Sequence, residues 1–482
     1  MKSPLSLSLI LLCFILSTPW TASRGQESDA PTAANNSDLM IGFAAEEITP
    51  PIPYRMSGYF NERLSTGTLD PLWAKALILS QNKTKAAILI CDIISIPDHV
   101  TTPIRENVSK AIGIPIENIV IAATHTHTGP LFEGKSREYL HQRAIERNGK
   151  DDAEIIDYQQ FLIQKGTDAL LKANETLRSA SITTQKVQTE NITFNRRFLM
   201  TDNTVVFNPG IKNPNIVHPA GPTDPEMQIV FFSDPETQKP FASLTNFALH
   251  LDTTGGTLNS GDYPYYIAEE LKKEWGDQFF SLFGTGTCGD LNHIDVSGQK
   301  SQKAETIGKE LAQLITDAHK NKNAEQENSN LAATEKRILW QRQQYSEAET
   351  EEAKKQMEIV VGEGNYPVTQ RARYSAMVEL AELPDFIYLQ AQVIRLSDET
   401  AIVAIPGEVF VELGLAIKEQ SPFKNTLIIE LSQTSLCYIP TIKAFKEGSY
   451  ETINSIIKPG GGEKIVEIAV EALNSLDMSP RN

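Results

Sequence analysis

Short apolar runs alternate with stretches of helical composition along most of this 482-residue chain. The runs are rich in β-branched residues and bounded by loop residues, as buried strands are; they lie at 85–92, 118–123, 228–232 and 401–405. The helix-like stretches lie around 98–113, 153–178, 262–275 and 302–320. This alternation predicts an α/β fold in which helices flank one or more mixed sheets in a single large domain. Sites in such folds gather where strands end and loops begin.

Residues 322–385 differ from the rest of the chain. The part from 341 to 355 is charged and strongly helical in composition, and Gly362-Glu-Gly-Asn-Tyr-Pro is a loop signal. Apolar character resumes at 387–396. We therefore predict a solvated helical excursion over 322–385 within the domain, and a last amphipathic helix at 464–476.

The first residues carry one positive charge, then an apolar run, then small residues at Thr21-Ala-Ser. This pattern predicts a secretory signal peptide over 1–25, with an uncleaved anchor as the alternative. Residues 26–39 have the polar composition of a disordered leader, so the folded domain is expected over 40–482. We therefore expect a secreted or periplasmic protein with no transmembrane span once the signal is removed.

The composition limits which partners the protein can bind and how many disulfides it can form. A net charge of −17 excludes a nucleic-acid binder, which needs basic residues to neutralise phosphates. Of the four cysteines, Cys13 lies in the expected signal peptide, which leaves Cys91, Cys288 and Cys437. No complete disulfide framework is then expected, and at most one pair can form.

Two of the eight histidines, His125 and His127, follow the apolar run at 118–123 in the segment ATHTHTGP. Side chains two residues apart on a strand point to the same face, so both imidazoles converge if the extended conformation persists. Metal ligands are often delivered in this way. The alternative is a polar strand edge whose imidazoles are hydrogen-bonded to neighbouring backbone.

Two further residues lie at similar places. His250 follows an apolar run in NFALHLDTTGG, and Glu408 follows the run at 401–405 after a Pro-Gly turn. Glu408 is expected in the first turn of a helix, where it either interacts with the helix dipole or points its carboxylate into the crevice at the sheet end. Zinc takes three or four N, O or S ligands and keeps a position open in catalytic sites. These residues together indicate a zinc site.

Four segments, ATHTHTGP, NFALH, IPGE and CYIPT, occur in an order that resembles the neutral (non-lysosomal) ceramidase family. Further similar segments are DPLWAKALIL, FNRR, TDPEMQIV, NSGDYPYYIAEEL and GTGTCGDLN. The resemblance runs from about Ile41 to Glu471. It implies a ceramidase-like zinc hydrolase domain, and because the chain ends about where that domain ends, we expect the family's C-terminal β-sandwich to be absent.

The resemblance also implies roles for individual residues. One zinc ion per chain would be bound by four residues, namely His125, His250, Glu408 and Tyr438. His127 would handle protons or contact the substrate, and Arg196 would help to hold the substrate. By itself, Tyr438 would be a packed ring with its hydroxyl at the surface.

The chemistry of such a site is coherent. Zinc lowers the pKa of a water molecule to about 7, which makes it a nucleophile for an amide carbonyl. His127 would move the proton to the departing amine, while Tyr438 and Arg196 would stabilise the oxyanion. Three aspartates are candidates to orient ligand imidazoles, with helix capping as the alternative; these are Asp252, Asp262 and Asp290.

The chain departs from the family pattern where the substrate is expected. The family's Gly-Asp-Val-Ser-Pro-Asn loop reads Gly289-Asp-Leu-Asn-His-Ile, so the task of the serine would pass to Asn292 or His293. Arg197-Phe-Leu replaces the family's Ser-Pro and aromatic residue. Cys288 and Cys437 lie beside two predicted site loops, and a disulfide between them is a further hypothesis.

The sequence therefore predicts an exported zinc amidohydrolase that cleaves the N-acyl bond of ceramide or a related N-acylated, lipid-like substrate. A metallohydrolase of other esters or amides is the alternative within the same chemistry. A binding homologue without catalysis is the alternative from another class, and the missing serine favours it.

Overall fold

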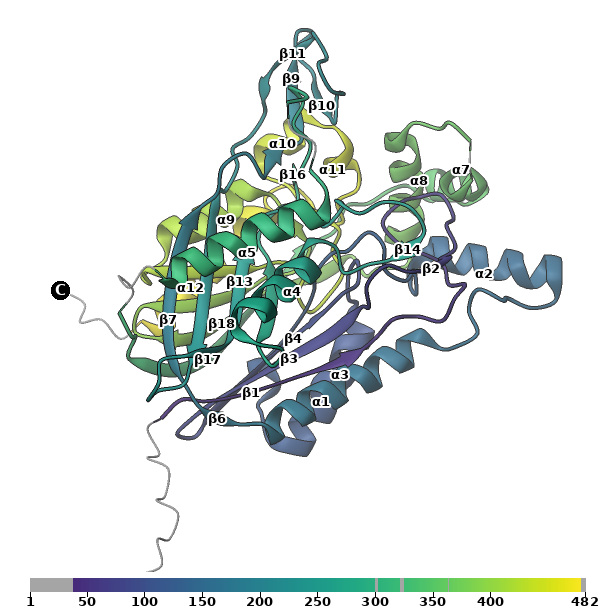
Figure 1. Ribbon diagram of the computed structural model, residues 1–482. Helices are drawn as coiled ribbons and strands as arrows, with labels where there is room; N and C mark the ends of the chain where they lie inside the picture. Colours follow the sequence, from purple (N-terminus) through teal and green to yellow (C-terminus); the bar gives the residue numbers. More distant parts are fainter. Residues whose placement is uncertain (1–37, 300–301, 321–324, 363, 478–482) are drawn as a thin grey trace, which may run out of the picture. The chain divides into compact units, whose positions relative to one another are not determined.

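The structure, a computed structural model, describes residues 38–299, 302–320, 325–362 and 364–477 (Figure 1). The expected signal peptide and all but the last residues of the expected leader lie outside the described residues. The first strand, β1, begins at Met40, directly after the buried Leu39. The described residues belong to one unit, Ser37–Asn482.

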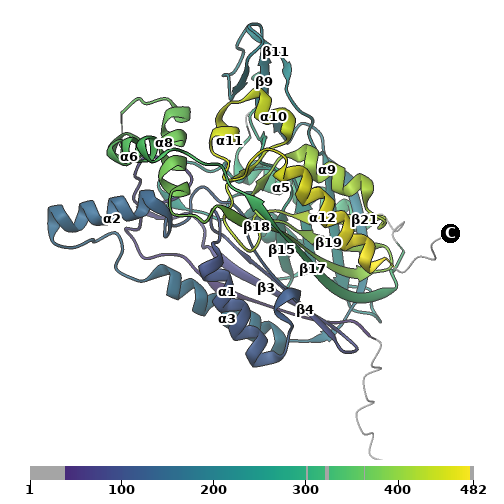
Figure 2. The ribbon, with the colours of Figure 1, turned by 180° about the vertical axis from the view of Figure 1, so that it is seen from behind.

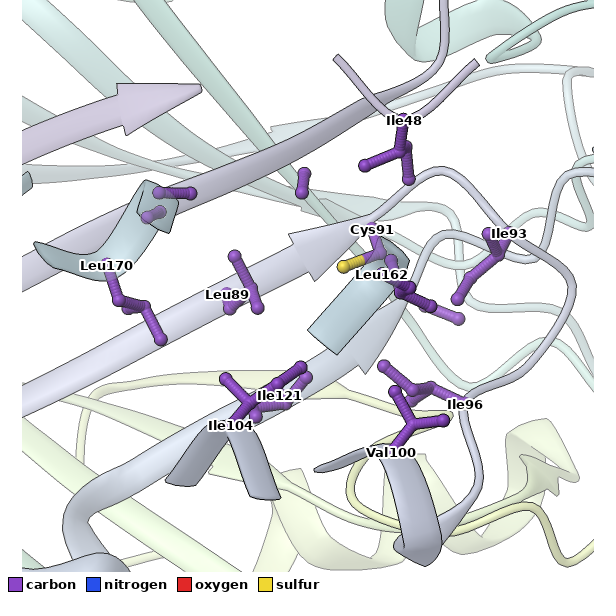
Figure 3. Close-up of a cluster of buried hydrophobic side chains, with 14 of the residues drawn as sticks. Ile48, Leu89, Cys91, Ile93, Ile96, Val100, Ile104, Ile121, Leu162 and Leu170 are labelled. Atoms are coloured by element: carbon purple, nitrogen blue, oxygen red, sulfur yellow. The ribbon is translucent and has the colours of Figure 1, made fainter. Parts of the chain in front are cut away.

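The first of three large sheets has the strand order β5-β4-β3-β1-β6. Its strands are β1 (Met40–Glu47), β3 (Trp73–Gln81), β4 (Thr84–Cys91), β5 (Ile119–Ala123) and β6 (Arg178–Ser179). Only β4 and β5 are parallel; the other neighbours are antiparallel. Helices α1 (Asp98–Ile112) and α3 (Tyr158–Glu175) cover its outer face. Figure 3 shows Leu89 and Ile121 of the sheet facing Ile104 and Leu162 of these helices.

The second sheet has the order β15-β13-β12-β7. Its strands are β7 (Ser181–Gln188), β12 (Glu226–Ser233), β13 (Pro240–Phe247) and β15 (Phe280–Thr285). Here β13 and β15 are the parallel pair. Helices α4 (Tyr263–Trp275) and α5 (Ala304–Lys320) cover the outer face (Figure 1).

The third sheet has the order β17-β18-β19-β21. Its strands are β17 (Ser329–Gln341), β18 (Phe386–Ser397), β19 (Thr400–Ala404) and β21 (Asn425–Ile429). Strands β19 and β21 are parallel. Helices α9 (Val411–Gln420) and α12 (Gly461–Leu476) cover it, as Figure 2 shows from behind.

The inner faces of the three sheets share one hydrophobic core. Ile88 of the first sheet, Leu244 of the second and Ile402 of the third belong to it, and each is fully buried. Because each sheet is covered by helices on one face and by the other sheets on the other, its strands read as nearly continuous apolar runs. The strands predicted at 85–92, 118–123, 228–232 and 401–405 are confirmed as β4, β5, β12 and β19, and the four predicted helices as α1, α3, α4 and α5.

The prediction for residues 322–385 is only partly correct. Residues 347–380 do form helices, α6 (Glu347–Lys355), α7 (Met357–Val361) and α8 (Val368–Leu380). Residues 329–341, however, form strand β17 at the edge of the third sheet. An edge strand leaves much of its surface in water and tolerates charged residues, which hid its strand character.

Shorter elements connect these layers. The helices are η1 (Ile116–Asn118), α2 (Gly134–Asn148), α10 (Ile442–Glu447) and α11 (Tyr450–Ile453). The strands are β2 (Gly67–Thr68), β8 (Phe194–Asn195), β9 (Arg197–Met200), β10 (Val205–Phe207), β11 (Ile216–Pro219), β14 (Leu258–Asn259), β16 (Leu291–Asn292), β20 (Glu408–Val409) and β22 (Tyr438–Ile439). Among the described helices, none is both long and apolar enough to span a bilayer.

Candidate metal centre

Each of the three large sheets sends one polar side chain to a common point. His125 follows β5, His250 follows β13 and Glu408 follows β19. Each of these three strands belongs to the one parallel pair of its sheet. The carboxyl ends of such strands are where α/β folds place their sites, so the topology brings together residues that are far apart in sequence.

The local conformation at His125 differs from the extended strand expected there. Strand β5 ends at Ala123, and His125 has a φ of 75°, in the left-handed region. Its N–H donates to the Ile93 carbonyl (2.9 Å), and its Nδ1 lies 2.7 Å from the Ile94 carbonyl oxygen. The expectation of strand alternation is therefore wrong. A strained turn, held by two backbone contacts, delivers the imidazoles instead.

The three imidazoles converge through their Nε2 atoms. His125 Nε2 lies 3.0 Å from His250 Nε2 and 3.3 Å from His127 Nε2. One carboxylate oxygen of Glu408, Oε2, lies 3.2 Å from His125 Nε2 and 3.8 Å from His250 Nε2. His125 and His250 are only 3% and 1% exposed, so these contacts are shielded from water.

Glu408 lies on a short strand and not in the first turn of a helix as expected. Strands β20 and β22 are parallel partners, with Glu408 opposite Tyr438, and helix α9 begins only at Val411. The Tyr438 hydroxyl is hydrogen-bonded to Glu408 and to Arg196. The structure thus brings together all four residues for which the resemblance implied a metal ligand.

The donor set fits a bound cation. The Nδ1 atoms of His125 and His250 face the Ile94 and Cys288 carbonyl oxygens, so each Nδ1 carries a proton and each Nε2 faces the cluster, with the two Nε2 atoms 3.0 Å apart. Glu408 Oε2 is buried and makes no well-directed hydrogen bond within the described chain. Buried polar atoms are normally satisfied. A cation between these atoms would be bound by the two Nε2 atoms and would satisfy the carboxylate oxygen.

The protonation states support the same conclusion. Burial and the neighbouring imidazole of His125 hold the pKa values of His127 and His250 well below the ordinary value, so both rings are neutral at neutral pH. Burial opposes ionisation of Glu408, but His125 and Arg196 nevertheless hold its pKa below the usual value. Neutral imidazoles and an ionised carboxylate are the forms that bind zinc.

His127 lies at the edge of the cluster beside a second polar group. Its Nδ1 is buried without a hydrogen bond and lies 3.7 Å from Asp252 Oδ1. The Tyr59 hydroxyl donates to Asp252, and the Tyr59 ring meets the His127 ring edge-on. Arg63 donates to the His127 carbonyl (2.8 Å). Asp252 therefore lies beside His127, and not beside one of the two imidazoles for which the resemblance implied a metal ligand.

The other two aspartates have different partners. Asp262 caps helix α4 and accepts hydrogen bonds from Thr253, Thr254 and Tyr263. Asp290 accepts from the Val411 N–H (2.8 Å) and from Asn195 Nδ2 (2.8 Å). No imidazole contact is formed by either residue in the described part of the chain. The capping alternative therefore holds for Asp262, and Asp290 fixes the turn after Glu408.

Arg196 is a buried cation whose donors are largely engaged by the protein. Its Nε donates to Glu451 Oε1 (3.0 Å) and its Nη2 to the Gly289 carbonyl (2.6 Å), besides its bond with Tyr438. Glu451, on α11, is fully buried. The charge of Arg196 thus acts on the site through Tyr438 and directly on Glu408, whose pKa it helps to lower.

The side chain of Asn292, which was expected to replace the family's serine, is hydrogen-bonded to neighbouring loop residues. Its Nδ2 donates to Asn208 Oδ1 (2.9 Å), and its Oδ1 accepts from the Ile294 N–H (3.0 Å). His293 instead lies near Asp252, which interacts with it electrostatically, and its Nδ1 is buried without a hydrogen bond. Of the two residues proposed for the serine's task, His293 is the one on the side of the imidazole cluster.

The hypothesised disulfide between Cys288 and Cys437 is absent, and all three cysteines of the described chain are free thiols. Cys288 Sγ donates to Glu430 Oε1 (3.1 Å) and lies 3.8 Å from His250 Nδ1. The Cys288 thiol is fully buried. Its side chain points toward the acidic residue, which explains why it does not pair with Cys437.

Several residues near the site were missed from the sequence, namely Tyr59, Glu430, Tyr450 and Glu451. Tyr450 hydrogen-bonds Tyr438, with the ring centroids 5.5 Å apart. Only Glu430 carries a usable signal, because an acidic residue directly after a buried apolar run is unusual. The others lie in loops or short helices that carry no such pattern.

Comparison with known proteins identifies relatives of this chain. The family model described as "Neutral/alkaline non-lysosomal ceramidase, N-terminal" matches residues 39–385, a range that ends before Glu408. Neutral ceramidase A of Dictyostelium discoideum is 26% identical over 277 residues, or 55% of this chain. The chain spans only 36% of the length of that relative.

Solved structures extend the likeness over most of the chain. The neutral ceramidase from Pseudomonas aeruginosa superposes with a TM-score of 0.70 at 16% identity and covers 92% of this chain and 75% of that one. A ceramidase complexed with C2 gives a TM-score of 0.68, also at 16% identity, over 91% and 75%. At this identity the likeness establishes the fold. With the family match over residues 39–385, the chain belongs to the neutral/alkaline non-lysosomal ceramidase family.

Proposed function

We propose that this protein is a zinc-dependent amidohydrolase that cleaves the N-acyl bond of ceramide or of a related N-acylated substrate. The observation that carries the proposal is the convergence of two Nε2 lone pairs and the Glu408 carboxylate at a buried point. The zinc ligands would be the four residues named above, His125, His250, Glu408 and Tyr438. Bound there, zinc supplies a Lewis acid that polarises a carbonyl and lowers the pKa of water to about 7.

The protein's own residues would handle the proton and the developing charge. His127 is neutral and lies beside the ligands, so it can accept the proton of the attacking water and donate it to the departing amine nitrogen. Asp252 would orient the His127 ring. The Tyr438 hydroxyl, polarised by Arg196, would donate to the oxyanion.

Export belongs to this proposal as well. The sequence of residues 1–25 supports a secreted or periplasmic location. The test is the N-terminal sequence of the protein recovered outside the cytoplasm; an N-terminus at Met1 on protein retained in the cell would contradict export.

A defined assay tests the activity. The purified protein is stripped with a chelator and reloaded with zinc, and fatty-acid release is measured from ceramides and from a panel of N-acyl amino acids and N-acyl sugars. We expect zinc-dependent release, abolished in His125→Ala and unchanged in His99→Ala, which removes an exposed imidazole on α1. Preference for a non-ceramide amide would revise the substrate.

A binding homologue without catalysis is the second candidate, because Asn292 stands where the family pattern has serine. Zinc binding without release of any acyl group from the panel would favour it.

A further inference from the structure

A buried carboxylate lies behind the histidine cluster and takes no part in the mechanism above. Glu430 follows β21, the parallel neighbour of the strand that precedes Glu408. It is fully buried, and no lysine, arginine or histidine forms an ion pair with it among the described residues. Burial raises the pKa of this carboxyl group well above its ordinary value, and a buried polar group is costly without partners, so its contacts call for an explanation.

The contacts of Glu430 reach two ligand-bearing segments. Its Oε1 accepts from the Cys288 thiol (3.1 Å), and Cys288 Sγ in turn lies 3.8 Å from His250 Nδ1. Its Oε2 accepts from the Val409 N–H (2.6 Å), the residue after Glu408. The Glu430 N–H donates to the Thr285 carbonyl (3.0 Å), which fixes the backbone from which the side chain points inward.

The direction of these hydrogen bonds is consistent. With His250 Nε2 turned to the cluster, its Nδ1 carries the proton and donates toward Cys288, whose carbonyl oxygen lies at 3.4 Å and whose sulfur lies at 3.8 Å. The thiol then donates to Glu430. Metal-bound histidines commonly donate their second ring N–H to a carboxylate or a carbonyl, which fixes the ring and raises its basicity. Here a thiol stands between the imidazole and the carboxylate.

We propose that Glu430 is a positioning residue of the metal site, which acts through Cys288 on His250 and through the Val409 N–H on Glu408. This inference rests on the proposed zinc site. It adds a carboxylate–thiol–imidazole relay, Glu430–Cys288–His250, to the four residues that bind the ion.

Zinc affinity tests the relay without relying on catalysis. The dissociation constant of the full-length protein is measured by competition with a chromophoric chelator. Glu430→Gln keeps the shape of the side chain but leaves the Val409 N–H or the thiol without an acceptor, and Cys288→Ala removes the bridge. We expect each change to raise the dissociation constant by about 10- to 100-fold. Cys288→Ser keeps a donor and an acceptor and should recover part of the loss.

Two controls separate positioning from stability. Cys91→Ala removes an equally buried free thiol in the first sheet and should bind zinc as the wild type does. The visible spectrum of the cobalt-substituted protein reports ligand geometry, so it should change in Cys288→Ala and stay unchanged in Cys91→Ala. The double variant Glu430→Gln/Cys288→Ala should lose less affinity than the two single losses added together, because the two changes share the branch through Cys288.

The outcomes are distinct. If the wild type binds zinc and both Glu430→Gln and Cys288→Ala bind it equally well, the relay is wrong and the zinc site stands. If those variants only lower the unfolding temperature of the metal-free protein, the relay is likewise wrong, since the residues are then structural. If the wild type binds no zinc, the proposed site fails and the relay fails with it.

Discussion

Glu408 and Tyr438 are opposite each other on two parallel two-residue strands, β20 and β22, and their side chains are hydrogen-bonded. The backbone ladder therefore sets the distance between the carboxylate and the phenol. Arg196 bonds the same phenol from the other side. The hydroxyl of Tyr438 is thus held between an anion and a cation before any substrate arrives.

Tyr438→Phe should separate the roles of this hydroxyl. The ring stays packed, but the donor to the oxyanion is lost, and we expect kcat to fall by about 10²- to 10³-fold. Zinc content should fall only in part, because two imidazoles and a carboxylate remain. Steady-state kinetics and metal analysis on the same sample measure both. Tyr388→Phe, at an exposed position of β18, is the control; an unchanged kcat in Tyr438→Phe would contradict the role.

His127→Gln should slow the reaction while the protein keeps its zinc. Loss of a general acid–base group typically costs about 10²- to 10⁴-fold in rate. In the wild type, burial lowers the pKa of His127, so kcat/KM should stay high as the pH falls through 6.5 and decline only at more acidic pH. The dependence of kcat/KM on pH measures this acidic decline. If the decline is centred above pH 6.5, or if His127→Gln shows the same decline, a group other than His127 is responsible for it.

Gly289→Ala should disturb the candidate metal site by displacing the backbone that carries Glu408. An added Cβ would lie 2.4 Å from the Glu408 carbonyl oxygen and 3.0 Å from the Val409 carbonyl carbon, and backbone atoms cannot step aside. We expect a loss of about 1–3 kcal/mol of stability together with weaker zinc binding. Thermal unfolding and chelator competition measure the two effects. Gly255→Ala meets open space and should be neutral; equal behaviour of the two variants would refute the close approach.

Glu133 should make stability depend on pH. Burial raises the pKa of this carboxyl to about 8, although a hydrogen bond from Ser95 opposes the shift. The folded state then binds more protons than the unfolded chain above the ordinary value of 4.5, so stability falls as the pH rises toward 8. Glu133→Gln should make this slope shallower, measured as the unfolding temperature from pH 5 to 9; burial also raises the pKa values of Asp70, Asp92 and Asp290 to about 6, so part of the slope remains. Glu146→Gln, exposed on α2, should keep it.

The sequence was sufficient for the elements that are buried on both faces. Strands such as β5 and β19 can be recognised in the sequence as short apolar runs. The helices between them can be predicted from the spacing of their apolar residues and from their length. It failed for β17, because an edge strand has polar composition, and for Glu408, because a two-residue strand leaves no period to read. Such short pairings are fixed by tertiary contacts alone.

For the site, the sequence located the histidines by their place after apolar runs, and the family resemblance was needed for Tyr438. The turn at His125 was not foreseeable, because a positive φ at a non-glycine residue depends on the Ile93 and Ile94 carbonyls that hold it. Glu430 was also missed, since its partners, Cys288 and Val409, meet it only in three dimensions.

Because each of the three sheets contributes one side chain to the candidate site, the site can form only late in the synthesis of the chain. His125 emerges from the ribosome early, but Tyr438 emerges only when nearly the whole domain has been made. The proposed zinc ion could therefore bind only after the three sheets have closed on each other. A cation that binds only this late state adds to its stability according to concentration and affinity, and its loss would first be seen as faster hydrogen exchange at the carboxyl ends of β5, β13 and β19.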